Sequence, residues 1–411
     1  MDLISLGLMA GLALFGGTMT SNNGPSMPMV KAHIADLNAQ RFIAPGTLHE
    51  ALAKRRFVLV GETHTDPEHH RVQLMVIQAL HKRRTSIAVG MEMFPRAMQP
   101  VLDRWIAGNL TEEQFLDESF WYLTWGFDAA LYLPILRFLR DERIPLFAMN
   151  IERKVVKETR RLGLENLPPD MRRMIPNPAP LPAPYRAELK ALYDAHPFMA
   201  KGAPFETFAQ AQQVWDAVMA DSMHQAAQRH PDTLIIGLAG NGHIIDGHGI
   251  PHQLRALLDH DIQSDPFRPE EPSPIATVIP WTVDEDYAHQ GAADFAWGTM
   301  PPPKQSFHGP ITPKLGVELP GWGEDSKPGA KIIQVMPDST AVAIGLKPHD
   351  RLTHLNDQPL INAHTLVRLL RNHKSGDIIT LALRRNGQRK QHTFRLPDAK
   401  PSPHHGMKMK R

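Results

Sequence analysis

The sequence contains no cysteine among its 411 residues. This absence excludes disulfides, thiolate nucleophiles, cysteine-based zinc sites and a lipid-modified cysteine. Any metal ion would therefore have to be held by histidine, carboxylate, tyrosine or methionine side chains.

The sequence also lacks an excess of charge of either sign. It has 45 Lys and Arg against 43 Asp and Glu, a formal net charge of +2. Such a balance gives no general field for nucleic acid, and we expect no nucleic-acid partner. The hydrophobic content of 42% is ordinary for a soluble globular protein, and the length predicts two domains and a tail.

An apolar stretch near the start, Leu3 to Gly17, has the length of a signal-peptide core and is short for a membrane span. Only Asp2 and Met1 precede it, so the basic residues that usually open a signal peptide are missing and the start site stays open. We expect residues 1–40 to hold a signal peptide or short membrane anchor and a polar linker. A periplasmic or cell-envelope location follows as an expectation.

Histidine is abundant, with 22 residues, and two histidines stand in a repeated Gly-x-x-His device. Gly61 to His64 follows the apolar run 57–60, and Gly240 to His243 follows the run 234–239. In a parallel sheet, the carboxyl ends of the strands meet at one edge, so the two histidines are expected to converge there.

Continuous apolar runs alternate with helical patterns between residues 41 and 300, which predicts a three-layer α/β domain with a mostly parallel sheet and helices on both faces. The predicted strands are 57–60, 87–91, 145–149, 234–239 and 276–279. The predicted helices are 67–82, 96–106, 131–141, 187–195, 205–228 and 253–258. Between them, the proline-rich stretch 167–204 reads either as a lid over the strand ends or as a surface excursion.

A second composition break begins at Met300, where three prolines open a linker to about residue 310. Short strand-like runs follow at 331–335, 351–355, 378–384 and 392–396, with Asn386-Gly387 as a hairpin turn and a helix at 363–371 that Asn362 caps. This pattern predicts a small β-rich domain at 311–397. Residues 398–411 read as a basic disordered tail.

Polar residues gather at the predicted strand ends. The two Gly-x-x-His turns and the second strand contribute four residues that we call the rim: Glu62, His64, Glu92 and His243. Asn241 lies in the second of these turns, and Gln212 and Asp216 share one face of the 205–228 helix.

Several chemistries fit the rim. His64, His243 and Glu62 could hold a divalent metal ion, although their spacing matches no compact metal motif. The rim could instead act as a general acid and base in hydrolysis, or bind haem through an axial histidine or tyrosine. A buried hydrogen-bond network without catalytic function is the remaining interpretation.

Five segments together resemble the ChaN family of the haem-binding-uptake and Tiki superfamily: GETHTDPEHH at 61–70, GMEMFPRAMQP at 90–100, AQQVWDAVMA at 211–220, AGNGHIIDGHGIP at 239–251 and ADFAW at 293–297. The resemblance implies a cell-envelope protein that binds haem for iron acquisition. It also implies distant relatives that are hydrolases, including metal-dependent proteases and macrolide esterases. The superfamily's functional positions fall on the four rim residues, whereas no motif identifies a haem axial ligand. The five tyrosines are candidates beside the histidines: Tyr122, Tyr132, Tyr185, Tyr193 and Tyr287.

The C-terminal domain resembles a bacterial PDZ domain of the kind attached to envelope proteases. Leu315, Gly316 and Val317 match the turn that binds a peptide carboxylate, and Leu366 lies on the helix expected to wall the groove. PDZ domains bind a peptide C-terminus by adding it as a strand. We therefore expect a haem-binding protein whose PDZ domain recruits a partner peptide, with a metal-assisted peptidase or esterase as the alternative.

Overall fold

The computed structural model describes residues 26–27, 30–84, 86–196, 203–263, 273–283, 288–301 and 315–397. These residues form two compact units, one of which combines the described parts of Leu110–Ala129 and Ser306–Arg411 while the other holds the remainder. The predicted signal segment, the linker residues 302–310, the tail 398–411 and Tyr287 lie outside the described residues. The domain boundaries expected from the sequence stay predictions.

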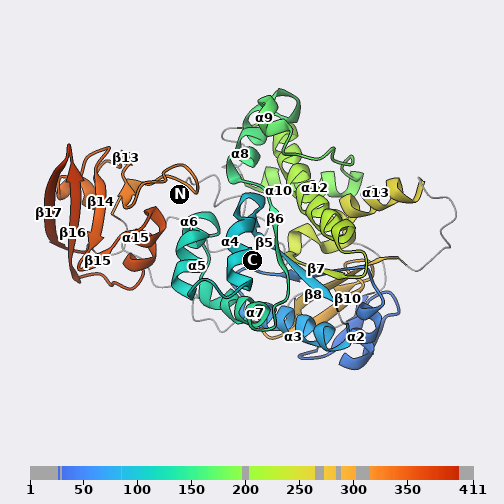
Figure 1. Cartoon of the computed structure of the whole chain (residues 1–411). Coiled ribbons are helices and arrows are strands. Elements are labelled where there is room, and N and C mark those ends of the chain that lie inside the picture. The colour runs from blue at the N-terminus through green and yellow to red at the C-terminus, as the bar shows by residue number, and fades with distance from the viewer. Residues whose placement is uncertain are drawn as a thin grey trace. The chain divides into compact units, whose positions relative to one another are not determined.

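The larger unit is built on an eight-stranded sheet with the strand order β3-β2-β10-β8-β4-β7-β5-β6 (Figure 1). The strands are β2 (Ile34–Asp36), β3 (Arg41–Ile43), β4 (Phe57–Glu62), β5 (Ile87–Pro95), β6 (Leu146–Asn150), β7 (Leu234–Gly240), β8 (Ile275–Thr282) and β10 (Phe295–Thr299). All neighbours are parallel from β10 to β6, and β2 alone runs in the opposite direction, pairing antiparallel with both β10 and β3. A separate two-stranded pair joins β1 (Ser26–Met27) to β9 (Ala288–His289). The predicted fold class is confirmed.

The strand order brings the two Gly-x-x-His turns to neighbouring strands of the sheet. β4, the earliest parallel strand, lies between β7 and β8, and β7 in turn pairs with β5. The register aligns Glu62 of β4 with Gly240 of β7, so both Gly-x-x-His turns begin side by side. Ligand sites in open α/β sheets form where successive connections leave the sheet on opposite sides, and β4 is such a point.

Helices cover both faces of the sheet, with α12 and α13 on one side and α2 and α3 on the other (Figure 1). The helices of this unit are α2 (Pro45–Ala53), α3 (Pro67–Arg83), α4 (Gln99–Ile106), α7 (Ala129–Asp141), α8 (Arg153–Leu162), α9 (Pro169–Arg172), α10 (Ala183–Ala195), α12 (Phe205–Arg229) and α13 (Ile250–Gln263), and the short 3₁₀ turns are η1 (Arg96–Met98), η2 (Leu164–Asn166), η3 (Asn241–His243) and η4 (Ile245–Gly247). None of the described helices is both long and apolar enough to span a membrane.

Three strands of this sheet escaped the sequence prediction because each is too short or too mixed to show a period. β2 and β3 have three residues each, and β2 lies before residue 41, in the stretch expected to be a polar linker. β10 joins the sheet through Phe295 to Thr299, and its neighbour β8 is the strand predicted at 276–279. The proline-rich stretch holds α9 and α10, and Ala179 at its centre is hydrogen-bonded to Gln213 of α12 and Gln253 of α13.

The second unit contains the β-rich domain. Its strands are β11 (Val317–Glu318), β12 (Ala330–Lys331), β13 (Gln334–Val335), β14 (Arg351–Leu355), β15 (Gln358–Pro359), β16 (Ile378–Arg385) and β17 (Gln388–Arg395), and its helices are α14 (Thr340–Ala343) and α15 (Ala363–Leu370). β16 and β17 form the predicted hairpin, in which Arg385 pairs with Gln388 across the Asn386-Gly387 turn. Asn362 caps α15 as predicted, because its side chain accepts a hydrogen bond from the Thr365 amide.

Two short helices of the same unit, α5 (Glu112–Glu118) and α6 (Trp121–Thr124), pack against α15. The buried Asp117 carboxylate accepts two hydrogen bonds of 2.8 Å from Arg368 and one of 2.9 Å from Nδ1 of His364. Nε2 of His364 accepts the Tyr122 amide at 2.9 Å, and the Tyr122 ring stacks on the imidazole at 5.4 Å. Residues 110–129 therefore hold the outer face of the PDZ helix through a specific polar contact.

Candidate functional site

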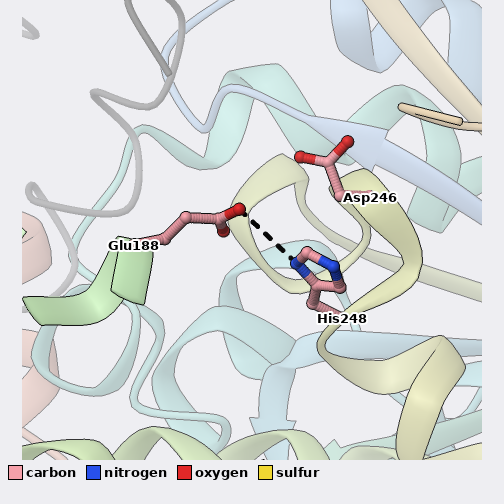
Figure 2. Close-up of side chains that lie close together, drawn as sticks. All are labelled: Glu188, Asp246 and His248. Carbon is pink, nitrogen blue, oxygen red and sulfur yellow. Dashed lines mark ion pairs between the residues drawn. The ribbon is translucent and has the colours of Figure 1, made fainter. Parts of the chain in front are cut away.

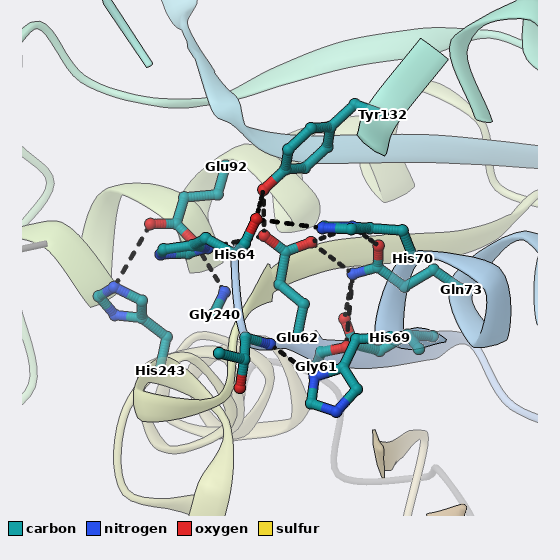
Figure 3. A network of polar contacts seen from close by, with 12 residues as sticks. Gly61, Glu62, His64, His69, His70, Gln73, Glu92, Tyr132, Gly240 and His243 are labelled. Carbon is teal, nitrogen blue, oxygen red and sulfur yellow. Dashed lines mark hydrogen bonds and ion pairs between the residues drawn. The ribbon is translucent and has the colours of Figure 1, made fainter. Parts of the chain in front are cut away.

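The rim begins at the end of β4, where Glu62 accepts hydrogen bonds from three different elements. His64 Nδ1 and the Tyr132 hydroxyl of α7 each lie 2.7 Å from Oε1, and Gln73 Nε2 of α3 lies 2.9 Å from Oε2 (Figure 3). The side chain is 1% exposed. A carboxylate buried to this degree is retained only when it is fully paired, and here it is.

The first turn of α3 brings two more histidines to this carboxylate. Asp66 caps the helix by accepting the Glu68 amide, and Pro67 fits the first helical position. His70 Nδ1 then lies 3.2 Å from Glu62 Oε2, and His70 Nε2 donates to the His64 carbonyl. His69 accepts the Thr63 amide on Nδ1 at 2.8 Å, so this ring is neutral and fixes the turn after β4.

Glu92 lies where the pairing of β5 with β6 is irregular. The register runs through Met91 opposite Ala148 and resumes at Pro95 opposite Asn150. Such irregularities redirect a side chain, and Glu92 Oε2 accepts the Gly240 amide of β7 at 2.7 Å. Asn150 supports this segment by donating to the Glu92 carbonyl.

His243, in the turn η3 after β7, lies between two carboxylates. Its Nδ1 is 2.6 Å from Asp216 Oδ1 of α12, and its Nε2 is 3.6 Å from Glu92 Oε1. Tyr185 of α10 donates to the other oxygen of Asp216 at 3.1 Å. All four side chains are less than 5% exposed.

The two histidine groups meet over Gly240. A Cβ atom on this residue would lie 2.9 Å from His64 Cε1 and 3.7 Å from Glu92 Oε2. Likewise, a Cβ on Gly61 would overlap the Asn241 side chain at 2.0 Å. Glycine at both positions is what lets the two Gly-x-x-His turns approach each other, and the structure thus brings the four rim residues together.

Opposite charges decide the protonation of the rim. Burial alone would raise the pKa of Glu62, but the positive charge of His70 and the hydrogen bonds of both histidines hold that pKa well below its usual range. Burial alone would lower the pKa of His243, but the charges of Glu92 and Asp216 and the Asp216 hydrogen bond raise it to about 8. Burial, followed by the charge of Asp216, raises the pKa of Tyr185. At neutral pH the site therefore holds an imidazolium at His243, with a neutral phenol at Tyr185.

Two of the predicted residues carry buried polar atoms for which the described part of the chain supplies no hydrogen-bond partner. These are Nε2 and Oε1 of Gln212, which is 0% exposed, and Oδ1 of Asn241. Orphaned buried polar atoms are rare and call for a partner such as water or a ligand. Gln212 and Asp216 lie one turn apart on α12 as the sequence predicted, and Asp216 reaches His243.

The predicted metal set of His64, His243 and Glu62 does not form a cluster of three close ligand atoms. Within the described ranges, the one group of three His, Asp or Glu side chains whose ligand atoms all lie within 4.8 Å of one another is Glu188, Asp246 and His248. Sequence reasoning missed Gln73 and Tyr132 as partners of Glu62, and Tyr185 as a partner of Asp216. The helical spacing of His70 and Gln73 was an available signal for Gln73 only.

In the second unit, the predicted peptide-binding turn is in place. Gly316 has a φ of +78°, and a Cβ there would lie 2.2 Å from Ser339 Cβ. Leu315 is buried and its carbonyl accepts the Ala341 amide, while Val317 opens β11. Leu366 is 1% exposed and therefore packs into the core beneath the helix rather than lying open on its surface.

Two known protein families match this sequence. Residues 48–254 match the family described as haem-binding uptake, Tiki superfamily, ChaN, and this range spans half of the chain and all four rim residues. The chain belongs to the ChaN family. Residues 313–396 match the PDZ domain, so this ChaN-family chain carries a PDZ domain at its C-terminal side. No curated protein matches the sequence.

Solved structures similar to this ChaN-family chain include one described as cofacial haem binding to ChaN of Campylobacter jejuni. It is 16% identical, covers 66% of this chain and 98% of its own, and has a TM-score of 0.48. An erythromycin esterase mutant, EreC in its open conformation, is 15% identical over 61% of this chain and 77% of its own, with a TM-score of 0.35. A serine endoprotease from Yersinia pestis is 21% identical over 21% of this chain and 29% of its own, with a TM-score of 0.18.

Proposed function

We propose that this protein binds haem at the strand-end site, acts in haem acquisition outside the cytoplasm, and recruits a partner peptide through its PDZ domain. The observation that carries the proposal is the family match over residues 48–254, which encloses the rim and its supporting helices. The apolar N-terminal stretch, read as an export signal or anchor, supports the location.

The donors at the rim are suited to an iron porphyrin. Histidines that ligate a metal usually donate their second ring N–H to a carboxylate, which orients the ring and raises its basicity. His64 and His243 each have Nδ1 hydrogen-bonded to a carboxylate, Glu62 and Asp216 respectively. Haem bound here would supply an iron with an axial position for one of these Nε2 atoms. The amide group of Gln212 and the Oδ1 atom of Asn241 would meet polar groups of the ligand.

Tyrosine is a poorer donor at this site. Tyr132 and Tyr185 both have their hydroxyls hydrogen-bonded to rim carboxylates, and the pKa of Tyr185 is raised by burial. Because an axial tyrosine binds as the phenolate, deprotonation beside Asp216 would be costly. His64 and His243 are thus the preferred axial candidates. Since both are buried, haem binding there requires the covering segments to move.

A haemin titration of the full chain followed by Soret absorbance tests the proposal. We expect a saturable shift at one haem per chain, weakened at least tenfold in His243→Ala. His81→Ala, which alters a half-exposed histidine of α3, serves as the matched control and should bind like the parent. Absence of a saturable shift in the parent protein would contradict haem binding.

The PDZ proposal has its own test. A fluorescent peptide library with free C-termini should contain binders whose affinity is lost when the terminal carboxylate is amidated, because a PDZ domain holds that carboxylate with the backbone N–H groups of such a turn. Equal affinity for the amidated peptides would show that the groove does not read a C-terminus.

One observation favours a second candidate, a hydrolase. His243 Nδ1 lies 2.6 Å from Asp216, and His243 Nε2 lies 3.6 Å from Glu92. The imidazolium that Asp216 positions therefore faces a second carboxylate. This arrangement can transfer a proton to a leaving group. Turnover of ester or peptide substrates that falls in His243→Ala, with no haem bound, would support this candidate instead.

A further inference from the structure

A second cluster lies at the outer edge of the site and involves none of the rim residues. Glu188 of α10, Asp246 of η4 and His248 lie close together (Figure 2), and one ligand atom from each lies within 4.8 Å of the others. Glu188 Oε1 and His248 Nδ1 are 3.6 Å apart. All three side chains are partly exposed, so the cluster is open to solvent.

The backbone commits Asp246 to this position. Asp246 has a φ of +56° and the next residue, Gly247, a φ of +69°, so two successive residues adopt the left-handed region. This conformation is strained for a non-glycine residue and persists only where its surroundings fix it. Here the Asp246 amide donates to Ala292 and its Oδ1 accepts Nε2 of His289 at 2.6 Å. Carboxylates that ligate metals are commonly held by such an outer hydrogen bond.

His248 has a ring nitrogen in need of a partner. Its Nδ1 is buried at the atomic level and makes no hydrogen bond with the described residues, although the side chain as a whole is 19% exposed. The Tyr185 ring packs 5.8 Å from the imidazole and limits its rotation. The nitrogen therefore lies 3.6 Å from the Glu188 carboxylate on a constrained ring.

We propose that Glu188, Asp246 and His248 bind a divalent first-row transition-metal ion such as Zn²⁺, with a fourth position open to water or a ligand oxygen. Ligands about 2.1 Å from a tetrahedral ion lie about 3.4 Å from one another. The 3.6 Å between Glu188 and His248 is close to that spacing. Imidazole with two carboxylates selects a transition metal over Mg²⁺ and Ca²⁺, which prefer oxygen ligands alone.

A metal ion at this position would also stabilise the segments that cover His243. A Cβ on Gly249 would lie 2.9 Å from Asp216 Oδ1 and 2.5 Å from the His243 carbonyl, so the segment carrying two of the ligands rests directly on the Asp216–His243 pair. α10 supplies both Glu188 to the cluster and Tyr185 to Asp216. The ion would fasten α10 to the 246–249 segment over the rim. This inference is independent of haem binding because it uses different residues.

The experiment is a competition titration of the chelator-treated full chain with Zn²⁺ against a chromophoric chelator, repeated with Co²⁺ by visible absorption. We expect one tight site per chain and cobalt bands of a four- or five-coordinate ion. In the double variant Glu188→Gln/Asp246→Asn the affinity should fall about 100-fold, and in His289→Ala about 10-fold, because that residue only supports Asp246. Glu165→Gln, an exposed glutamate of η2, is the control and should retain the site.

Three outcomes would overturn the proposal. The first is an unchanged Zn²⁺ affinity in the double variant, which would point to other ligands such as the tail residues His404 and His405. The others are tighter binding of Mg²⁺ than of Zn²⁺ and the absence of a tight site in the parent chain. The double variant keeps the shape of both side chains and removes their charge. Its circular dichroism and its melting temperature without metal verify that it folds. A His248→Gln variant tests the third ligand separately, and it should lose the cobalt spectrum. Haemin titration of the double variant distinguishes this site from the rim, since the Soret response should persist without the metal.

Discussion

At the scale of single residues, the rim is an alternation of carboxylates and histidines that fix each other's protonation. Glu62 is ionised because His70 and its hydrogen bonds favour the charged form, whereas the negative charges of Glu92 and Asp216 favour the protonated form of His243. The two Gly-x-x-His motifs identified His64 and His243 from the sequence alone. The other partners of Glu62 could not be found in this way, because Tyr132 and Gln73 come from helices whose apolar periods mark only a buried face.

The raised pKa of His243 predicts how ligand binding depends on pH. The folded-state pKa is about 8, so the Nε2 lone pair is blocked by a proton below that pH. If His243 is the axial ligand, haem affinity should rise by about tenfold per pH unit up to pH 8 and level off above it. Soret titrations from pH 6 to pH 9.5 measure this. A profile flat across the range would exclude His243 as the ligand and direct attention to His64.

The pKa of His69 is shifted in the opposite direction, and this shift predicts how the stability of the fold depends on pH. Burial, followed by the charge of His70, lowers the pKa of His69 to about 3. Because the folded pKa lies below the unfolded value of 6.5, the unfolded chain binds the extra proton, and stability falls as the pH drops from 6.5 toward 3. The loss should be about 1 kcal/mol per pH unit. In His69→Gln, whose amide oxygen can still accept the Thr63 amide, denaturation curves should show a weaker dependence over this range.

At the scale of elements, the parallel strands were readable because they are continuous apolar runs, and β4, β7 and β8 all lie where the sequence predicted them. The end of β5 was not readable, since the irregular pairing that turns Glu92 toward Gly240 depends on β6 and β7. α5 and α6 were also missed. They are short, and their aromatic and polar residues contact α15, nearly 250 residues later in the chain.

The junction of β4 and β7 predicts the result of a glycine substitution. In Gly240→Ala the new Cβ would press on His64 Cε1 at 2.9 Å, and neither strand can retreat within the sheet. We expect a loss of about 2 kcal/mol in the free energy of unfolding, together with weakened ligand binding. Gly46→Ala is the control, because a Cβ there meets nothing within 4 Å. Equal stability of the two variants would show that the turns are less closely packed than described.

The contact of α5 with α15 predicts a local effect within the smaller unit. Asp117→Ala leaves the Arg368 guanidinium and His364 without their buried acceptor, which should cost about 3 kcal/mol. Amide hydrogen exchange of residues 363–370 should accelerate accordingly. Glu113→Ala removes only a 3.9 Å exposed ion pair with Arg368 and should leave exchange unchanged. Unchanged protection in Asp117→Ala would show that α15 is stabilised by the PDZ core alone.

At the scale of the whole molecule, the chain joins a ChaN-family domain to a PDZ domain, and both were recognisable from sequence motifs. The compact units do not follow that division, because residues 110–129 lie within the ChaN-family match and pack with the PDZ domain. The composition of residues 110–129 gave no sign that they pack with the PDZ domain, since the segment is an ordinary helical stretch whose partner is determined by tertiary contacts. The outer cluster at Glu188 was equally hidden, as its three residues come from α10 and a turn after β7.

The central claim is that strand ends far apart in the sequence form one binding site. The most direct test is a double-mutant cycle of haemin affinity on the full chain with His64→Ala, His243→Ala and the combined variant. We predict that each single substitution weakens binding at least tenfold and that the combined loss differs from the sum of the two by about 1 kcal/mol or more, since residues within one network do not act independently. If only one substitution affects binding, or if the two losses simply add, the two Gly-x-x-His turns do not form a shared site.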